Sequence, residues 1–500
     1  MHVSTLLEMA VDGFGDRVAF GSRRSGLTYA QLMDRARRAA AIVHRRGVEC
    51  VGLVDVSSEA VPILLYGSGL AGVPFVPINY RLDDDHLRAV LERTAPSLMV
   101  VEDPVVGRVG EVPGVELVTR SAFFRQLDAA APDDAPNTAA DPEDIALLLF
   151  TSGTTGDPKA AVLRHKHLTS YVITTVEFMG ADEDDAALVS VPPYHVAGTS
   201  AVLSSVFAGR RVVYLPAFTP EAWLATARDE AVTQAMVVPT MLARVLDLLE
   251  QQQERLPCLR HLAYGGGRMP VPVLERALAA LPDVEFVNAY GLTETSSTIS
   301  VLGSDDHREA AASSDERVRR RLGSVGRPLP TLEVEIRDDD GKPVGVNVPG
   351  EIFVRGDQVA GEYLGRAALT ADGWFPTRDA GFLDEDGYLY LSGRLDDVIV
   401  RGGENMSPGE IEDVLVSHPA VADAGVVGVP DVEWGEKIVA AVVLRGAAST
   451  TEDELQDWVR SHLRSSKTPE HVEFREQLPY SETGKLLRRV LKTELTARLT

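Results

Sequence analysis

Cysteine is scarce in this chain of 500 residues, which contains only Cys50 and Cys258. Two cysteines so far apart argue against a disulfide framework and against a cysteine-based metal site, and no His/Cys spacing suggests structural zinc. The first five residues lack a basic region followed by a long apolar stretch. No signal peptide is therefore indicated, and we predict a cytoplasmic protein.

Long uninterrupted apolar runs are also missing. Two stretches, Val61–Asn79 and Ala186–Gly209, lack Asp, Glu, Lys and Arg, but prolines and glycines break both of them. Such stretches are typical of buried strand–turn–helix structure rather than of membrane helices. We therefore predict no integral membrane association.

Positive charge is in deficit, with 49 Lys and Arg against 74 Asp and Glu, a net charge of −25. This balance argues against a general nucleic-acid binder and against a protein that binds anionic membranes. Residues 461–500 differ, because eight basic residues there outnumber five acidic ones. The basic residues of this segment suggest that it binds an anionic ligand. A solvent-exposed face of a helix remains a plausible alternative explanation of the positive charge.

The 45% apolar and 25% charged residues are those of an ordinary globular protein, and the length exceeds what one core supports. Thr28–Arg46 is predicted to be a helix, with Thr28 and Gln31 as a capping box and Gly47 as the stop. Predicted buried strands alternate with helices, at 51–56, 75–78, 145–150, 212–215, 235–238 and 286–288. This alternation predicts layered α/β structure with largely parallel sheets. The charged segment 304–321 is predicted to be exposed or mobile.

The sequence pattern changes from Pro349 onward, where short predicted strands are separated by Gly/Asp turns. Ser407, Pro408 and Glu410 predict a helix that begins with a capping box. Further strands at 421–429, 438–444 and 471–475 and a helix at 452–463 complete a compact α+β unit. The boundary between the two units is predicted near 393–397.

The strongest local motif is Thr-Ser-Gly-Thr-Thr-Gly-Asp-Pro-Lys at 151–159, directly after an apolar run. Small residues let the backbone approach phosphate oxygens, hydroxyls and N–H groups can donate to them, and Lys159 adds positive charge. The loop is not a Walker A motif, because the Gly-Lys-Ser/Thr ending is absent. We interpret it as a phosphate-binding loop.

Further motifs follow in order, at 192–195, 264–267, 288–295, 373–379, 393–397, 401–405 and 481–485. With this combination, the chain resembles the adenylate-forming superfamily of acyl-CoA synthetases, nonribosomal adenylation domains and luciferases. The resemblance implies a large N-terminal domain, 1–395, of layered α/β sheets with a β-barrel-like subdomain. A small mobile α+β lid domain, 396–500, would follow a hinge at Asp396. A monomer or homodimer is expected.

The resemblance also implies the chemistry. A carboxylic acid attacks the α-phosphorus of ATP with Mg²⁺ present, and the thiol of coenzyme A then displaces AMP. The residues that would take part in catalysis are Lys485, Glu294, His195 and Thr293. The residues that would bind the nucleotide or coenzyme A are Thr151, Ser152, Gly153, Thr154, Thr155, Lys159, Gly265, Gly266, Asn288, Ala289, Tyr290, Asp379, Arg394, Arg401, Gly402, Gly403 and Trp434. Thr155 and Glu294 would hold the metal, and His195, Val196, Ala197, Gly265 and Gly291 would line the acyl site.

Several alternatives stay open. Taken alone, Tyr290 is better explained as a core tyrosine, and only the resemblance favours a contact with adenine. For Trp434, packing in the domain core is nearly as good an explanation as a contact with coenzyme A. The adenylate could be passed to a carrier protein or an amine, or the activated anion could be nitrite, as in a diazotase. A silent ATP- or acyl-binding protein is disfavoured by Lys485, Glu294 and Asp379. Because no carrier-protein segment follows Lys485 in this sequence, a standalone ligase is expected.

Three positions depart from the family pattern. Ala160 and Arg378 stand where the family usually has glycine, and Arg268 stands where a small residue is common. Arg378 adds a bulky charge beside the predicted nucleotide site, where it could contact phosphate or alter the second step.

Overall fold

The computed structural model describes residues 1–136, 141–151, 159–253, 255–402, 404–481 and 486–499, and all structural statements below concern these residues. Their strands form four sheets. The first is mainly parallel, and its strands in spatial order are β15 (Arg327–Pro328), β14 (Ser297–Leu302), β13 (Glu285–Leu292), β12 (His261–Gly265), β11 (Gln234–Val237), β9 (Ala186–Val189), β10 (Arg211–Tyr214), β1 (Val18–Phe20) and β2 (Leu27–Thr28). Strands β1 and β9 to β13 run parallel, whereas β2, β14 and β15 pair antiparallel to their neighbours.

The second sheet combines a parallel half with an antiparallel edge. Its order is β19 (Arg366–Ala367), β18 (Glu362–Tyr363), β8 (Lys159–Arg164), β7 (Ile145–Thr151), β4 (Phe75–Pro77), β3 (Cys50–Val54), β5 (Ser97–Val101) and β6 (Val115–Thr119). Strands β3 to β7 are parallel. Strand β8 turns back beside β7 and then carries β18.

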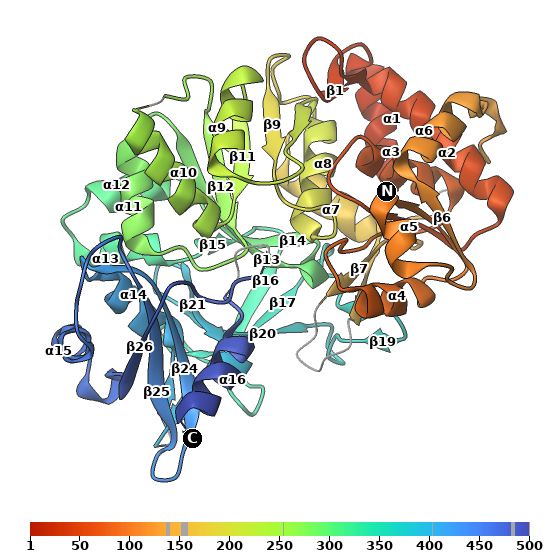
Figure 1. Cartoon of the computed structure of the whole chain (residues 1–500). Coiled ribbons are helices and arrows are strands. Elements are labelled where there is room, and N and C mark those ends of the chain that lie inside the picture. Colours follow the sequence, from red (N-terminus) through yellow and green to blue (C-terminus); the bar gives the residue numbers. More distant parts are fainter. Residues whose placement is uncertain (137–140, 152–158, 254, 403, 482–485, 500) are drawn as a thin grey trace.

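Helices cover the two sheets and lie between them (Figure 1). In the first half of the chain these are α1 (Val3–Phe14), α2 (Tyr29–Arg46), α3 (Ala60–Ala71), α4 (Asp84–Glu92), α5 (Asp103–Val109), α6 (Arg120–Ala129), η1 (Pro132–Asp134), α7 (His165–Thr175) and α8 (Val196–Ala208). The next are α9 (Pro220–Asp229), α10 (Pro239–Gln252), α11 (Val271–Ala280), η2 (Thr293–Thr295), α12 (Ser304–Ala312), α13 (Glu316–Arg319) and η3 (Arg320–Gly323). The predicted cap of α2 is confirmed, because Thr28 and Gln31 form a reciprocal capping box and Gly47 ends the helix with φ +62°.

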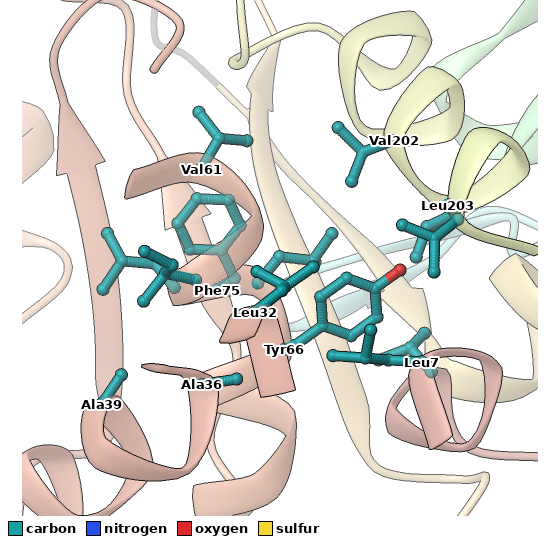
Figure 2. Close-up of a cluster of buried hydrophobic side chains, with 14 of the residues drawn as sticks. Leu7, Leu32, Ala36, Ala39, Val61, Tyr66, Phe75, Val202 and Leu203 are labelled. Carbon is teal, nitrogen blue, oxygen red and sulfur yellow. The ribbon is translucent and has the colours of Figure 1, made fainter. Parts of the chain in front are cut away.

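The largest core lies between the two sheets. Figure 2 shows Leu7, Leu32, Tyr66, Phe75 and Leu203 pointing toward one another, and they belong to α1, α2, α3, β4 and α8 in that order. Helices α2 and α3 approach closely because small residues meet there: a Cβ on Gly67 would lie 2.7 Å from Cβ of Ala39. Burial of this apolar surface fixes α8 against the first sheet, and that packing determines where the site described below can lie.

The third sheet is antiparallel and stands where the β-barrel-like subdomain was expected. Its strands are β16 (Glu333–Arg337), β17 (Gly350–Arg355), β20 (Phe375–Leu383) and β21 (Leu389–Arg394). In β20 and β21, Asp379 and Arg394 are directly paired across the ladder. The apolar face of this sheet packs with Tyr290 of β13 and thereby joins the third sheet to the first. The three sheets that precede η4, with their helices, are called the large lobe below.

The small lobe follows η4 (Leu395–Asp397). Its fourth sheet contains β23 (Glu404–Met406), β22 (Ile399–Arg401), β25 (Gly435–Leu444), β24 (Val421–Asp431) and β26 (His471–Arg475). Helices α14 (Pro408–Ser417), α15 (Glu452–His462) and α16 (Arg488–Leu499) and the short η5 (Ser465–Lys467) complete it. Alternate residues of β24 and β25 enter two separate apolar clusters, one with α14 and α15 and the other with α16. Both faces of this sheet are therefore covered, as the predicted α+β unit requires.

One local expectation holds with an exception, and another is wrong. The residues of segment 304–321 are exposed or half-buried as predicted, except that α12 buries His307 and Ala310, and the His307 ring lies 2.8 Å from the Tyr264 hydroxyl. The helix at Pro408 begins after Ser407 as expected, but without a capping box. The Ser407 hydroxyl instead donates to the carbonyl of Ser392, and Glu410 pairs with Lys467.

Candidate functional site

Two adjoining cavities lie between the carboxyl ends of the first sheet's parallel strands and the small lobe. The large cavity has a volume of about 2400 Å³ and the small cavity about 1310 Å³. They share lining residues from the large lobe, including Gly265, Ala289 and Arg394, and residues from the end of the chain, including Tyr480 and Leu486. The carboxyl ends of parallel strands are the usual place for ligand sites in α/β proteins.

Most of the described residues predicted for the site meet there. The large cavity is lined by Thr151, Lys159, His195, Val196, Ala197, Gly265, Gly266, Ala289, Gly291, Thr293, Glu294, Arg394 and Asp396. The small cavity is lined by Gly265, Gly266, Asn288, Ala289, Tyr290, Gly291, Asp379 and Arg394. Three other predicted residues, Arg401, Gly402 and Trp434, line neither cavity. The predicted residues Ser152, Gly153, Thr154, Thr155, Gly403 and Lys485 lie outside the described residues.

Asp379 is the centre of a buried polar cluster beside the small cavity. Only 7% of this residue is exposed. One carboxylate oxygen accepts a hydrogen bond of 2.7 Å from the Tyr290 hydroxyl, and the other accepts one of 2.9 Å from Arg394. Burial alone would lower the pKa of Arg394, but the charge of Asp379 and its hydrogen bond outweigh burial and raise that pKa. The cluster therefore holds a fixed carboxylate at the wall of the cavity.

Glu294 lies in η2, at the end of β13, where Gly291 permits a close approach to the backbone of Ser297. Its carboxylate accepts a hydrogen bond of 2.5 Å from the Tyr363 hydroxyl. The Lys159 ammonium stands 5.9 Å from the centre of the same tyrosine ring. Burial and then the Glu294 charge raise the pKa of Tyr363, so its hydroxyl stays a donor. Tyr363 thus connects two predicted site residues, and sequence reasoning missed it because a lone tyrosine on a short strand carries no motif.

The ends of the phosphate loop are held by backbone pairing. Thr151 and Lys159 stand opposite each other at the ends of β7 and β8, and the Thr151 hydroxyl donates to the Lys159 carbonyl. Both residues line the wall of the large cavity. Ala160, one of the departures from the family pattern, is buried in β8 opposite Phe150.

His195 precedes α8 and lines the large cavity. Burial lowers its pKa to about 4, so the ring is neutral at physiological pH. Its ring centre lies 4.7 Å from that of Tyr194. A neutral imidazole at this position can pack and donate a hydrogen bond, but it adds no charge to the site.

We expect the free energy of unfolding to fall as pH drops from about 6.5 to about 4. Burial lowers the pKa of His2, His167 and His195 to about 4 and that of His165 to about 3. Between the folded and unfolded pKa values the unfolded chain binds more protons than the folded one. Each of these histidines therefore lowers the free energy of unfolding by at most about 1.4 kcal/mol for each pH unit of acidification. Above pH 6.5 this loss vanishes. Urea unfolding at a series of pH values measures it.

His195→Phe should make that pH dependence shallower, whereas substitution of the exposed His44 by Gln should leave it unchanged. An unfolding free energy that stays constant between pH 6.5 and 4 in the native chain would contradict the burial argument.

Arg401, Gly402 and Trp434 form a separate group on the small lobe and line neither cavity. The Arg401 guanidinium lies 4.7 Å from the centre of the Trp434 ring and pairs with Glu470 at 2.6 Å. Trp434 is 44% exposed, so the alternative that it is a core residue is wrong. In the orientation described here, this group is not brought together with Glu294 and Asp379.

Both arginine departures form ion pairs with the small lobe or its connection. Arg378 has φ +63°, a conformation that explains why glycine is usual there, and its guanidinium donates to Asp396 over 3.2 Å. Arg268, which follows the glycine turn after β12, pairs with Asp413 of α14. Burial raises the pKa of Asp413 and the Arg268 charge opposes that rise. These arginines tie the lobes together in this orientation.

We expect Arg268→Ala to weaken that orientation by about 1 kcal/mol, or about fivefold in population, because the lost pair is only partly exposed. Small-angle scattering and a distance measurement between one label on each lobe report the shift. Arg276→Ala is the matched control, because Arg276 of α11 pairs within the large lobe, with Glu250 and Asp247. Equal effects of both variants on the distance between the lobes would contradict the assignment.

Comparison with known proteins identifies the class. Residues 7–364 match the AMP-binding enzyme family, and residues 410–485 match the AMP-binding enzyme C-terminal domain. The chain therefore belongs to the AMP-binding enzyme family, in agreement with the resemblance read from its motifs. No helix among the described residues is long and apolar enough to cross a membrane.

Individual relatives are similar over nearly their whole length. Feruloyl-CoA synthase of Amycolatopsis sp. is 34% identical, with 93% of each chain covered. Fatty acid–[acyl-carrier-protein] ligase ScoC of Streptomyces coeruleorubidus is 32% identical over 93% of this chain and 91% of that one. The structure of o-succinylbenzoate CoA synthetase from Bacillus subtilis, in complex with its acyl-adenylate intermediate, has a TM-score of 0.83 and 29% identity, covering 97% of both chains. The same protein is also known in complex with ATP and magnesium ion.

Proposed function

We propose that this protein is an ATP-dependent carboxylate–CoA ligase that forms an acyl-adenylate and then an acyl-CoA thioester. The observation that carries the proposal is the gathering of Asp379, Arg394, Glu294 and His195 around adjoining cavities between the lobes. The described residues on both sides of Lys485, Ser481 and Leu486, line the same cavities. The relatives that are CoA ligases support the same reaction.

In the first step, a carboxylate oxygen forms a bond to the α-phosphorus of ATP. The bond from that phosphorus to the bridging oxygen breaks, and pyrophosphate leaves. No general base is needed, since the carboxylate is ionised at neutral pH. The task of the enzyme is to position two anions and to neutralise their charge. Lys159, Lys485 and Thr293 are the residues we assign to that task.

The position of Asp379 indicates where the ribose of the nucleotide would bind. A carboxylate only accepts hydrogen bonds, which suits the two hydroxyls of a ribose. Arg394 and Tyr290 hold this carboxylate in place, and Ala289 and Asn288 line the wall where adenine would lie. Glu294, with Thr155, would hold Mg²⁺, which prefers one or two carboxylates together with phosphate oxygens and would neutralise the phosphate charge. One carboxylate at the cavity wall fits that preference.

In the second step, the thiol sulfur of coenzyme A attacks the acyl carbon. It loses its proton, and AMP leaves with one oxygen that came from the acid. We propose that the small lobe rotates at Asp396 between the two steps, so that the group of Arg401, Gly402, Gly403 and Trp434 replaces the Lys485 segment beside the adenylate. The exposed Trp434 ring with Arg401 stacked on it supports a role in binding a ligand outside the small lobe's core.

The acid is a fatty, aryl or related carboxylic acid. His195, Val196, Ala197, Gly265 and Gly291 line the large cavity, and small side chains there leave room for an aryl ring or an alkyl chain. Loading of a carrier protein is the second candidate, which the similarity to ScoC favours.

A single assay separates the candidates. The enzyme, ATP and Mg²⁺ are incubated with a panel of fatty and aryl acids, with coenzyme A or with a phosphopantetheinyl carrier protein, and the products are identified by mass spectrometry. We expect an acyl-CoA thioester together with AMP and pyrophosphate. Acid-dependent AMP formation without any CoA thioester would reject coenzyme A as the acceptor, and a carrier-bound thioester would establish the second candidate.

A further inference from the structure

The large cavity extends far beyond the predicted acyl site. Small residues of one face of α8 line it from beginning to end, namely Ala197, Ala201, Ser204, Ser205 and Ala208. Across from them, the cavity is lined by residues of β9 and by Gln234, Ala235 and Met236 of β11. A helix of 13 residues is about 20 Å long, so the cavity continues from His195 along most of the height of the first sheet.

Arg210 lines the far end of this cavity. It directly follows Gly209, which ends α8, and it precedes β10, so it lies at the opposite end of the helix from His195. Its Nε atom is buried and has no hydrogen-bond partner in the part of the chain that the structure describes. Burial lowers the pKa of Arg210, and among the described residues no carboxylate acts on that pKa to offset burial. An arginine in such a position keeps a charge that nothing in the described protein neutralises.

The neighbouring Arg211 provides a comparison, because its side chain is paired as a structural arginine usually is. Arg211 donates to the carbonyl of Gly21 at 2.9 Å and pairs with Glu230 at 2.7 Å. Buried charges are usually paired in this way, because an isolated one is strongly unfavourable. Arg210, which is half-buried, therefore differs from the fully buried Arg211 in having no carboxylate partner among the described residues.

The groups near Arg210 leave its donors available. The Tyr29 hydroxyl donates to the backbone carbonyl of Arg210 at 2.9 Å, and its pKa is raised by burial, so it carries no charge. His261 cannot neutralise Arg210, because an imidazole carries no negative charge in either protonation state. The carboxylate beside His261, Glu285, lies 3.2 Å from its ring. Gln234, at the first position of β11, also lines the cavity and supplies a neutral amide.

From this geometry we infer that Arg210 binds a carboxylate at the far end of the substrate, so that the activated acid is an elongated dicarboxylic acid. The inference rests on the proposed function and specifies its substrate class. One carboxylate would be activated beside His195, and the second would pair with the guanidinium at the other end of α8. A carboxylate matches the fork of donors on a guanidinium and removes the cost of its unpaired charge.

The first test uses straight-chain α,ω-dicarboxylic acids of increasing length, each compared with the monocarboxylic acid of the same carbon number. We expect kcat/KM for the diacid to exceed that of its monoacid at one chain length, where the second carboxylate reaches Arg210. In Arg210→Met this ratio should fall at least about tenfold. A ratio that never exceeds one, or one that the substitution leaves unchanged, overturns the inference. If instead no acid releases pyrophosphate, the proposed function itself is wrong.

A second test measures ligand binding and stability through the melting temperature, independently of catalysis. Arg210→Met should not lower the melting temperature of the ligand-free enzyme, because it removes an unpaired buried charge. Arg211→Met is the matched control and should lower it, since Glu230 then loses its partner. With AMP present, the preferred diacid should raise the melting temperature of the native enzyme and raise that of Arg210→Met less. A loss of stability in Arg210→Met equal to that in Arg211→Met would show a structural role and overturn the inference.

Discussion

Replacing Lys485 by alanine is expected to lower the rate of acyl-adenylate formation by about a hundred- to a thousandfold at saturating ATP, the usual effect of removing one group that stabilises transition-state charge. The incoming carboxylate and the α-phosphate are both anionic, and negative charge accumulates as they approach. An ammonium group between them stabilises that charge more in the transition state than in either reactant. Pyrophosphate exchange into ATP, dependent on the acid, measures the step.

The same variant provides its own control. Thioester formation from a presynthesised acyl-adenylate should be nearly unchanged in Lys485→Ala, because the proposed rotation removes this lysine from the second step. Lys342→Ala, at an exposed lysine in the turn between β16 and β17, should alter neither step. An equal loss in both half-reactions would show that Lys485 does not distinguish them, and that the two orientations of the small lobe are wrongly assigned.

Substitution of Asp379 by alanine should lower kcat/KM for ATP by about a hundredfold or more. The change removes the acceptor proposed for the ribose hydroxyls and also leaves Arg394 and the Tyr290 hydroxyl without their shared partner. Unpaired buried donors cost about 1–3 kcal/mol each, so we also expect a lower free energy of unfolding. Kinetics with ATP and urea unfolding measure the two effects separately.

Asp384→Ala is the control for the structural part. Asp384 is also buried in the third sheet's region, pairs with Arg320 at 3.4 Å and accepts from the backbone of Tyr388, but it lines neither cavity. The Asp384→Ala variant should therefore be less stable than the native enzyme, while its KM for ATP stays near the native value. If Asp379→Ala and Asp384→Ala changed KM for ATP alike, Asp379 would have no direct part in nucleotide binding.

Local signals in the sequence were sufficient for much of the fold. Thr28, Gln31 and Gly47 determine both ends of α2 through contacts within a few residues, and the structure has the helix as predicted. The prediction of a capping box at Ser407 is wrong because a distant contact decides the outcome there. The Ser407 hydroxyl donates to the carbonyl of Ser392, which lies near it only in the packed structure. His307 was missed because the charges around it indicate exposure, whereas one face of α12 is buried.

The same distinction holds for the candidate site. Motif residues such as Asp379 and Glu294 could be predicted because their neighbours in sequence carry the family pattern. Tyr363 and Arg210 could not, since each takes its significance from residues distant in sequence. The departures Arg268 and Arg378 were visible in the sequence, but their partners Asp413 and Asp396 became evident only once the lobes were packed.

The most direct test of the account follows one oxygen atom. If an acid labelled with oxygen-18 in its carboxylate is converted to its CoA thioester by this enzyme, the attack on the α-phosphorus leaves one labelled oxygen on the phosphorus. We predict that the AMP released carries one oxygen-18 atom for each thioester formed and that the pyrophosphate carries none. Label in inorganic phosphate, with ADP as the nucleotide product, would contradict the acyl-adenylate.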